Sequence, residues 1–150
     1  MITEEYKKEK TCLFYASTYH LEMILLPYII KKEKVIIFTE QELETTINTL
    51  LEKINLSVEE KQKIKQINWK TEEENKIEEI KSFKEKQENI TVIINGKKEY
   101  IEHINNKIKE IGNNNIEIID CYKIGDIDIE ETRKKYKIIL NTQKLETITR

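Results

Sequence analysis

Four polar side chains follow directly on an apolar run near the amino end of the chain. Residues 12–16 (CLFYA) have the composition of a buried strand, and the next residues are Ser17, Thr18, Tyr19 and His20. If a helix begins here, the free N–H groups of its first turn attract an anion. The hydroxyls and the imidazole would add hydrogen bonds to a phosphate or carboxylate group. A structural explanation fits the same residues, because Ser17 or Thr18 would cap the helix.

A second candidate for anion binding lies near residue 95. Asn95, Gly96 and Lys97 follow the apolar run Ile90–Ile94, and a helical pattern comes next. A strand, a glycine and a basic residue that opens a helix form the outline of a phosphate-binding turn. A glycine at such a place is also explained by the positive φ that a tight turn favours. Thr39, at the end of another apolar run, completes the predicted ligand-binding set.

The sequence lacks the short motifs that identify catalytic or nucleotide-binding centres. It has no G-x-x-x-x-G-K-[ST], no G-x-G-x-x-G and no G-x-S-x-G. The two histidines, His20 and His103, have no partner at metal-ligand spacing, and Cys12 opens a strand, where nothing lowers a thiol pKa. We therefore predict no catalytic residue, no metal site and no cofactor.

Short β-branched runs alternate with longer segments of helical period, which is the pattern of βαβ units. The predicted strands are Leu13–Ala16, Lys34–Phe38, Ile90–Ile94, Ile116–Cys121 and Lys137–Leu140, with a weaker one near Ile67–Trp69. The predicted helices are Thr18–Lys32, Gln41–Ile54, Val58–Gln66, Glu72–Gln87, Lys98–Ile111 and Ile129–Tyr136. Strands without polar alternation indicate a parallel sheet covered on both faces. The sequence predicts one three-layer αβα domain over residues 1–150, with a mostly parallel sheet of five or six strands, Rossmann-like or degenerate RecA-like.

Helix boundaries are marked by local sequence signals. The capping box Ser/Thr-x-x-Glu begins at Thr39, Ser57 and Thr71, and Asp128 has an analogous place before a fourth helix. Gly112 follows a helical segment, as a C-terminal glycine would. These signals predict where four helices begin and where one ends.

Residues 57–87 form a charged helical excursion within the predicted domain. Their apolar stripe is thin, with Ile77, Ile80 and Phe83 at spacings of three. Such a stripe covers a sheet poorly, so we expect the excursion to lie at the edge of the domain or to protrude. Trp69 and Phe83 are candidates for contact with a protein partner, and an ordinary solvated helix is the alternative.

Composition excludes several classes of protein. The 26 Lys and Arg nearly cancel the 28 Asp and Glu of the 150 residues, to a net charge of −2, and the two signs are interspersed. A nucleic-acid binder usually carries a basic excess, which argues against that function. No apolar stretch approaches the roughly 18 residues that cross a bilayer, and the charged start MITEEYKKEKTC is unlike a secretory signal. We therefore expect a cytoplasmic protein, whose Cys12 and Cys121 are buried free thiols.

Residues 12–38, CLFYASTYHLEMILLPYIIKKEKVIIF, resemble the opening of the MEDS-type sensory domains. A strand ending in Tyr, a helix with the mid-helix pair Pro27-Tyr28 and a short apolar strand carry the resemblance. The chain departs from the family at residues 31–34, where Lys-Lys-Glu-Lys replaces a glycine-bearing loop. The resemblance implies a RecA/KaiC-like domain without the phosphate loop, which receives a signal and catalyses nothing. It assigns no site residue.

Three functions therefore compete. The first is a small regulatory, ligand-sensing or partner-binding module, the second a small phosphate- or nucleotide-binding enzyme that uses the loops at the carboxyl ends of the strands, and the third a structural subunit of a larger assembly. An anionic small molecule is the ligand expected at the Ser17–His20 and Asn95–Lys97 loops.

Overall fold

The computed structural model describes residues 10–112 and 114–141. These residues form five strands and six helices. The strands are β1 (Thr11–Tyr15), β2 (Val35–Thr39), β3 (Ile90–Asn95), β4 (Ile116–Lys123) and β5 (Ile138–Leu140). The helices are α2 (Thr18–Ile30), α3 (Glu44–Leu51), α4 (Val58–Lys65), α5 (Glu74–Glu85), α6 (Lys98–Ile111) and α7 (Ile129–Arg133).

The five strands form one parallel sheet in the order β2-β3-β4-β1-β5. The predicted α/β class and parallel sheet are confirmed. The weak strand predicted near Ile67–Trp69 is wrong, because this segment is an irregular connection between α4 and α5. Trp69 is held there by burial and by a hydrogen bond from its Nε1 to the carbonyl oxygen of Ile64, at 2.8 Å.

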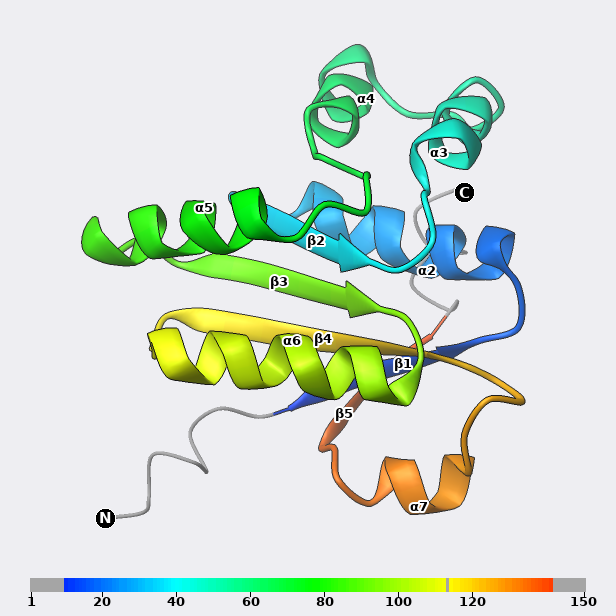
Figure 1. The fold of residues 1–150 in the computed structure, drawn as a ribbon. Coiled ribbons are helices and arrows are strands. Elements are labelled where there is room, and N and C mark those ends of the chain that lie inside the picture. Colours follow the sequence, from blue (N-terminus) through cyan, green and yellow to red (C-terminus); the bar gives the residue numbers. More distant parts are fainter. Residues whose placement is uncertain (1–9, 113, 142–150) are drawn as a thin grey trace.

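Helices cover both faces of the sheet, so the fold has three layers. Side chains of a strand alternate between faces: Leu13 and Tyr15 contribute to one apolar core, and Cys12 and Phe14 to the other. The first core contains residues of α2, α3 and α4, and the second contains residues of α5 and α6. Figure 1 shows α6 in front of the sheet and α2 behind it. The short α7 lies on the α6 side, where the flanking residues Ile127 and Tyr136 pack against the second core.

Both cysteines lie in the sheet interior. Cys12 on β1 and Cys121 on β4 are free thiols with no exposed surface. Burial raises the pKa of Cys12 to about 12, and burial likewise raises that of Cys121. The expectation of buried free thiols is confirmed, and neither thiol has the ionised form that a nucleophile needs.

Two of the four predicted helix starts are correct. Ser57 and Glu60 form a complete capping box on α4, and Asp128 Oδ1 accepts the first-turn N–H groups of α7. The predictions at Thr39 and Thr71 are wrong, because α3 begins only at Glu44 and α5 only at Glu74. The predicted C-terminal glycine, Gly112, ends α6 with φ of +102°.

The charged excursion over residues 57–87 wraps around the edge strand β2. Helix α4 packs against α2 on one face, whereas α5 packs beside β2 on the other (Figure 1). Ile64 and Trp69 lie in the first core and Ile80 in the second, so the excursion is anchored on both sides of the sheet. Trp69 is only 3% exposed, which argues against the predicted partner contact through its ring.

In residues 10–112 and 114–141, no helix combines the length and the apolar character that a membrane span requires.

Candidate functional site

The carboxyl ends of all five strands meet at one edge of the parallel sheet. Ser17 follows β1, Thr39 ends β2 and Asn95 ends β3, so the structure places these three predicted residues along the same edge. The connection after β1 leads to α2 on one face, whereas the connection after the neighbouring β4 leads to α7 on the other. Open α/β sheets usually bind ligands at such a point. Tyr19, on the first turn of α2, is 60% exposed there.

The side chains of the β1–α2 junction are engaged with one another. Ser17 has extended backbone angles, and its Oγ accepts the N–H of His20 at 3.2 Å, as an N-cap does. His20 Nδ1 accepts the N–H of Ala16 at 2.9 Å. Thr18 Oγ1 accepts a hydrogen bond from Gln41 Nε2 at 3.0 Å. The capping role foreseen for Ser17 is therefore present, and both His20 and Thr18 already have hydrogen-bond partners.

A buried row of polar side chains crosses the same edge from β1 to β2. The Tyr15 hydroxyl donates to Asn95 Oδ1 at 2.7 Å, and Asn95 Nδ2 donates to Thr39 Oγ1 at 3.1 Å. The Thr39 hydroxyl in turn donates to the carbonyl oxygen of Gln41 at 2.6 Å. Burial raises the pKa of Tyr15 to about 12, with further contributions from nearby negative groups. Thr39 and Asn95 thus hold the ends of three strands together.

The protein's own carboxylate occupies the predicted phosphate-binding turn. Glu40, directly after β2, accepts the backbone N–H of Lys97 at 2.7 Å with its Oε1. Lys97 is the N-cap of α6 and makes no side-chain cap bond itself. The helix N-terminus therefore already has a negative group beside it, which its partial positive charge stabilises. A phosphate at the Lys97 N–H would have to displace Glu40.

Gly96 is required by close packing at this turn. A Cβ at this position would lie 2.6 Å from Glu40 Oε1 and 2.6 Å from Tyr100 Cδ2. Glu40 can move aside, but the Tyr100 ring is fixed on the first turn of α6 and its hydroxyl is buried. We expect Gly96→Ala to lower the free energy of unfolding by about 1–3 kcal/mol, as overpacking does.

The control for this prediction is Gly96→Ala in a Glu40→Ala background. Removing Glu40 removes one of the two close contacts, so the alanine should cost less there than in the wild-type chain. Urea denaturation of the four proteins gives the coupling energy. Equal costs in both backgrounds would show that Glu40 does not lie against Gly96.

The described residues offer no centre for a metal ion. In residues 10–112 and 114–141, no three His, Cys, Asp or Glu side chains are close enough to hold one. His103 Nε2 lies 3.0 Å from Glu73 Oε2, within hydrogen-bond distance, and both side chains face solvent in part. No family model, curated protein or solved structure matches the chain.

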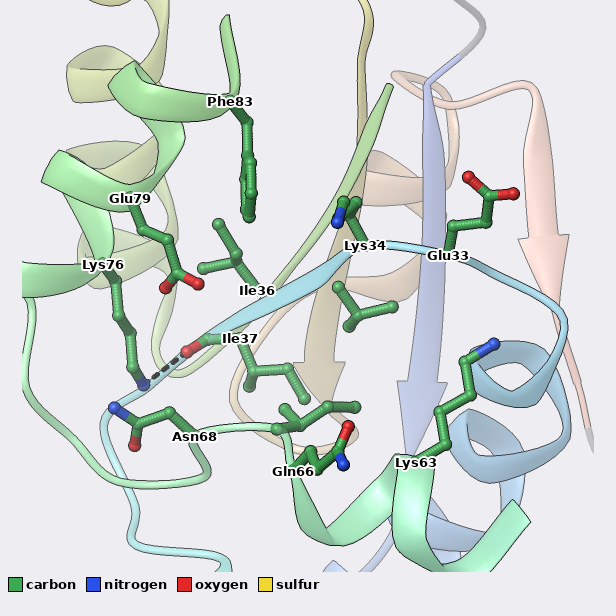
Figure 2. Close-up of a pocket in the computed structure, with 12 residues that line it drawn as sticks. Glu33, Lys34, Ile36, Ile37, Lys63, Gln66, Asn68, Lys76, Glu79 and Phe83 are labelled. Carbon is green, nitrogen blue, oxygen red and sulfur yellow. Dashed lines mark hydrogen bonds between the residues drawn. The ribbon is translucent and has the colours of Figure 1, made fainter. Parts of the chain in front are cut away.

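A pocket of about 210 Å³ lies away from this edge, along the outer side of β2. Figure 2 shows its walls: β2 and the residues before it, the end of α4, the connection that follows, and the inner side of α5. Lys76 and Phe83 point from α5 towards β2, and Asn68 lies beside the Lys76 amino group (Figure 2). Phe83 is half-buried, and Lys34 Nζ lies over its ring, 5.2 Å from the ring centroid.

Lys76 is the most unusual charged residue of this pocket. Its side chain is 1% exposed, and its Nζ donates to the carbonyl oxygens of Ile37 and Lys70. In the described part of the chain, it belongs to none of the ion pairs. Burial lowers its pKa to about 8, whereas the carboxylates of Glu72 and Glu79 act in the opposite direction.

A second buried network lies on the α6 side of the sheet. Asp120 on β4 is 2% exposed and accepts hydrogen bonds from Tyr136 Oη at 2.5 Å and from Asn105 Nδ2 at 3.0 Å. The Tyr136 hydroxyl also contacts that of Tyr122 at 2.6 Å. Burial raises the pKa of Asp120, although both hydrogen bonds act against this. The network fastens the segment after α7 to the sheet.

Tyr15, Lys76 and Asp120 have roles that were not among the predicted sites. Lys76 carried a readable signal, because it stands four residues before Ile80 and seven before Phe83 and so lies on the buried stripe of α5. Asp120 likewise stands inside an apolar run. A charged residue at a core position is the feature that should have drawn attention.

Proposed function

We propose that the chain is a regulatory module that binds a protein partner and has no catalytic centre of its own. The proposal rests on one observation about the carboxyl ends of the strands, where α/β domains usually bind ligands. Hydrogen bonds within the protein already occupy most of the polar groups there. Six of the eight residues predicted to bind an anion already have hydrogen bonds within the protein, through Ser17 Oγ, Thr18 Oγ1, His20 Nδ1, the side chains of Thr39 and Asn95, and the Lys97 N–H.

Two further observations support a binding role over an enzymatic one. The likeness of residues 12–38 to MEDS-type sensory domains, which stays a prediction, implies a signal-receiving domain of degenerate RecA-like form. The partner contact predicted for Phe83 remains open, because this half-buried ring lines the pocket beside β2. The free thiols of Cys12 and Cys121 agree with a reducing compartment, and we place the module in the cytoplasm.

Thermal unfolding with phosphate compounds tests this proposal. We expect no rise in melting temperature for the wild-type protein in millimolar inorganic phosphate, ATP or a sugar phosphate, because Glu40 holds the Lys97 N–H. A ligand that binds only the folded state must raise stability by mass action. A selective rise with phosphate compounds would instead support the phosphate- or nucleotide-binding enzyme.

Glu40→Ala is the matched variant for this experiment. It frees the N–H groups at the start of α6 and removes one negative charge. A phosphate-induced rise in the variant alone would show that Glu40 closes an anion site. A rise of equal size in both proteins would show that phosphate binds elsewhere and would contradict the closed-edge argument.

A further inference from the structure

An open groove separates the two short helices α3 and α4. Both helices contact α2 and have little contact with each other, and Figure 1 shows them standing beside one another. The groove has a volume of about 490 Å³. Its lining consists of Asn48, Leu51 and Glu52 on the α3 side and of Lys61 and Lys65 on α4. Leu51 is buried, whereas the polar residues are at least partly exposed, so a binding partner can reach them.

One flank of α4 carries the groups that a partner would contact. Val58, Lys61 and Lys65 follow one another at spacings of three and four residues, so they lie along one stripe of the helix. The two lysines line the groove, and Val58, which begins the stripe, is 76% exposed. In residues 10–112 and 114–141, neither lysine belongs to an ion pair. The stripe therefore offers an apolar contact and two ammonium groups that a partner can pair.

The groove favours a ligand that carries carboxylates on one side. Both lysines stand on the α4 wall, whereas the single carboxylate of the lining, Glu52, stands at the end of α3. Residues four apart on a helix are separated by about 6 Å along its axis. Lys61 and Lys65 therefore match two glutamates that are four residues apart on one face of another helix.

A helix fits these walls better than an extended segment does. Strand addition requires free backbone N–H and C=O groups, which helices such as α3 and α4 use for their own hydrogen bonds. An added helix satisfies its own backbone and packs its side chains between two neighbouring helices. Each wall is a helix of 8 residues, about 12 Å long, so the contact covers about two turns of the added helix.

We propose that an acidic amphipathic helix of a partner protein binds in the groove between α3 and α4, with two glutamates on Lys61 and Lys65 and an apolar side chain on Val58. This inference rests on the proposed partner-binding function and names the chemistry of the partner. The contact is short and its charges are exposed, so we expect weak and reversible binding, as in transient signalling complexes.

A small molecule fits this groove less well than a helix. The volume lies within the roughly 300–1,000 Å³ that is typical of small-molecule sites. Such sites are lined mainly by apolar side chains, however, and Leu51 is the one apolar residue of this lining. Charged and partly exposed walls are instead typical of the rim of a protein contact.

Three alanine-rich helical peptides of about 20 residues, alike except at two positions four residues apart, test the proposal. The two positions hold glutamate, glutamine or lysine, and a leucine stands three residues to either side of the pair. We expect the glutamate peptide to shift the amide resonances of α3 and α4, including those of Lys61 and Lys65, and to leave those of α6 in place. The glutamine peptide should bind about threefold to thirtyfold more weakly, because it lacks two exposed ion pairs, and the lysine peptide more weakly still. Equal affinities would refute the acidic preference, and shifts confined to other elements would refute the groove.

Lys61→Glu/Lys65→Glu tests the charges on the protein. This double variant should bind the lysine peptide most tightly and the glutamate peptide most weakly. Lys134→Glu/Lys135→Glu is the matched control, because it changes the net charge equally at exposed residues beside α7, on the other face of the sheet. It should keep the wild-type order of affinities. A wild-type order in the groove variant, or a reversed order in the control, would overturn the proposal.

Val58→Ala tests the apolar contact. It should weaken the binding of all three peptides by the same factor, about twofold to fivefold, because it removes apolar surface from the contact and changes no charge. Unchanged affinities would refute the contact at Val58.

Sedimentation of the protein alone distinguishes a partner from a second copy of the chain. A dimer that Lys61→Glu/Lys65→Glu abolishes would assign the groove to a second copy and overturn the partner helix. Failure of every peptide to bind would refute this inference, but the partner-binding function would stand if phosphate compounds are also without effect. A selective response to phosphate compounds would refute that function whatever the peptides do.

Discussion

Trp69→Ala is expected to lower the free energy of unfolding by about 3–5 kcal/mol, the largest single loss in this set. The indole is 3% exposed and packs in the core formed with α2, α3 and α4. Its Nε1 donates to the carbonyl oxygen of Ile64, so the alanine also loses this hydrogen bond, although the carbonyl keeps the backbone N–H of Ile67. Urea denaturation followed by far-ultraviolet circular dichroism measures the loss.

Val58→Ala provides the surface control for Trp69→Ala. Val58 begins α4 and is 76% exposed, so its truncation should change stability by no more than about 0.5 kcal/mol. If Trp69 were instead a partner contact on the surface, its substitution would be as mild as that of Val58. A small loss for Trp69→Ala would therefore reverse our conclusion about its burial.

The second large effect is a rise of stability with pH that depends on Lys76. The folded-state pKa of about 8 lies below the ordinary value of 10.5, so between these values the unfolded chain binds more protons than the folded one. The contribution of Lys76 to stability must then increase as the pH rises through this window. The gain from this group is about 3 kcal/mol at most, since one pKa unit corresponds to about 1.4 kcal/mol.

Lys76→Met should abolish that rise, and Lys81→Met should retain it. Lys81 lies on the same helix but is half exposed and pairs only with Glu78. The comparison belongs below pH 9, because the buried thiols of Cys12 and Cys121 have pKa values raised above the ordinary 9.0 and destabilise the folded state once the unfolded chain ionises. Buried tyrosines such as Tyr15 act in the same way from about pH 10. Denaturation midpoints of the three proteins at successive pH values give the slopes. A wild-type slope equal to that of Lys76→Met would show that Lys76 is not desolvated.

The strands could be predicted because a strand that is buried on both faces is a continuous run of apolar residues. Runs such as Ile90–Ile94 have no polar alternation, and the structure confirms a strand at each of the five strong runs. The segment Ile67–Trp69 has the apolar residues of a strand for a different reason. Ile67 and Trp69 anchor a connection to a core, which needs no partner strand.

The helix starts show how tertiary contacts override a local motif. Thr39 has a glutamate three residues later, as a capping box requires. Its hydroxyl bonds instead to Asn95 and to the carbonyl oxygen of Gln41, and α3 begins only at Glu44. Ser57 has no such competing partner and caps α4 as predicted. The contact between Glu40 and Lys97 is beyond sequence reasoning for a similar reason, because it joins residues 57 positions apart that only the strand order brings together.

The strand order also has a consequence for how the chain acquires its structure during synthesis. Within residues 10–112 and 114–141, β1 pairs only with β4 and β5, the last two strands described, and β2 pairs only with β3. No two strands can pair before residues 90–95 have been made, and the first strand waits until residues 116–123. Pairing over such sequence distances is slow. We therefore expect the nascent β1, with its apolar Cys-Leu-Phe-Tyr run, to stay exposed to aggregation, and open to a chaperone, until β4 has been made.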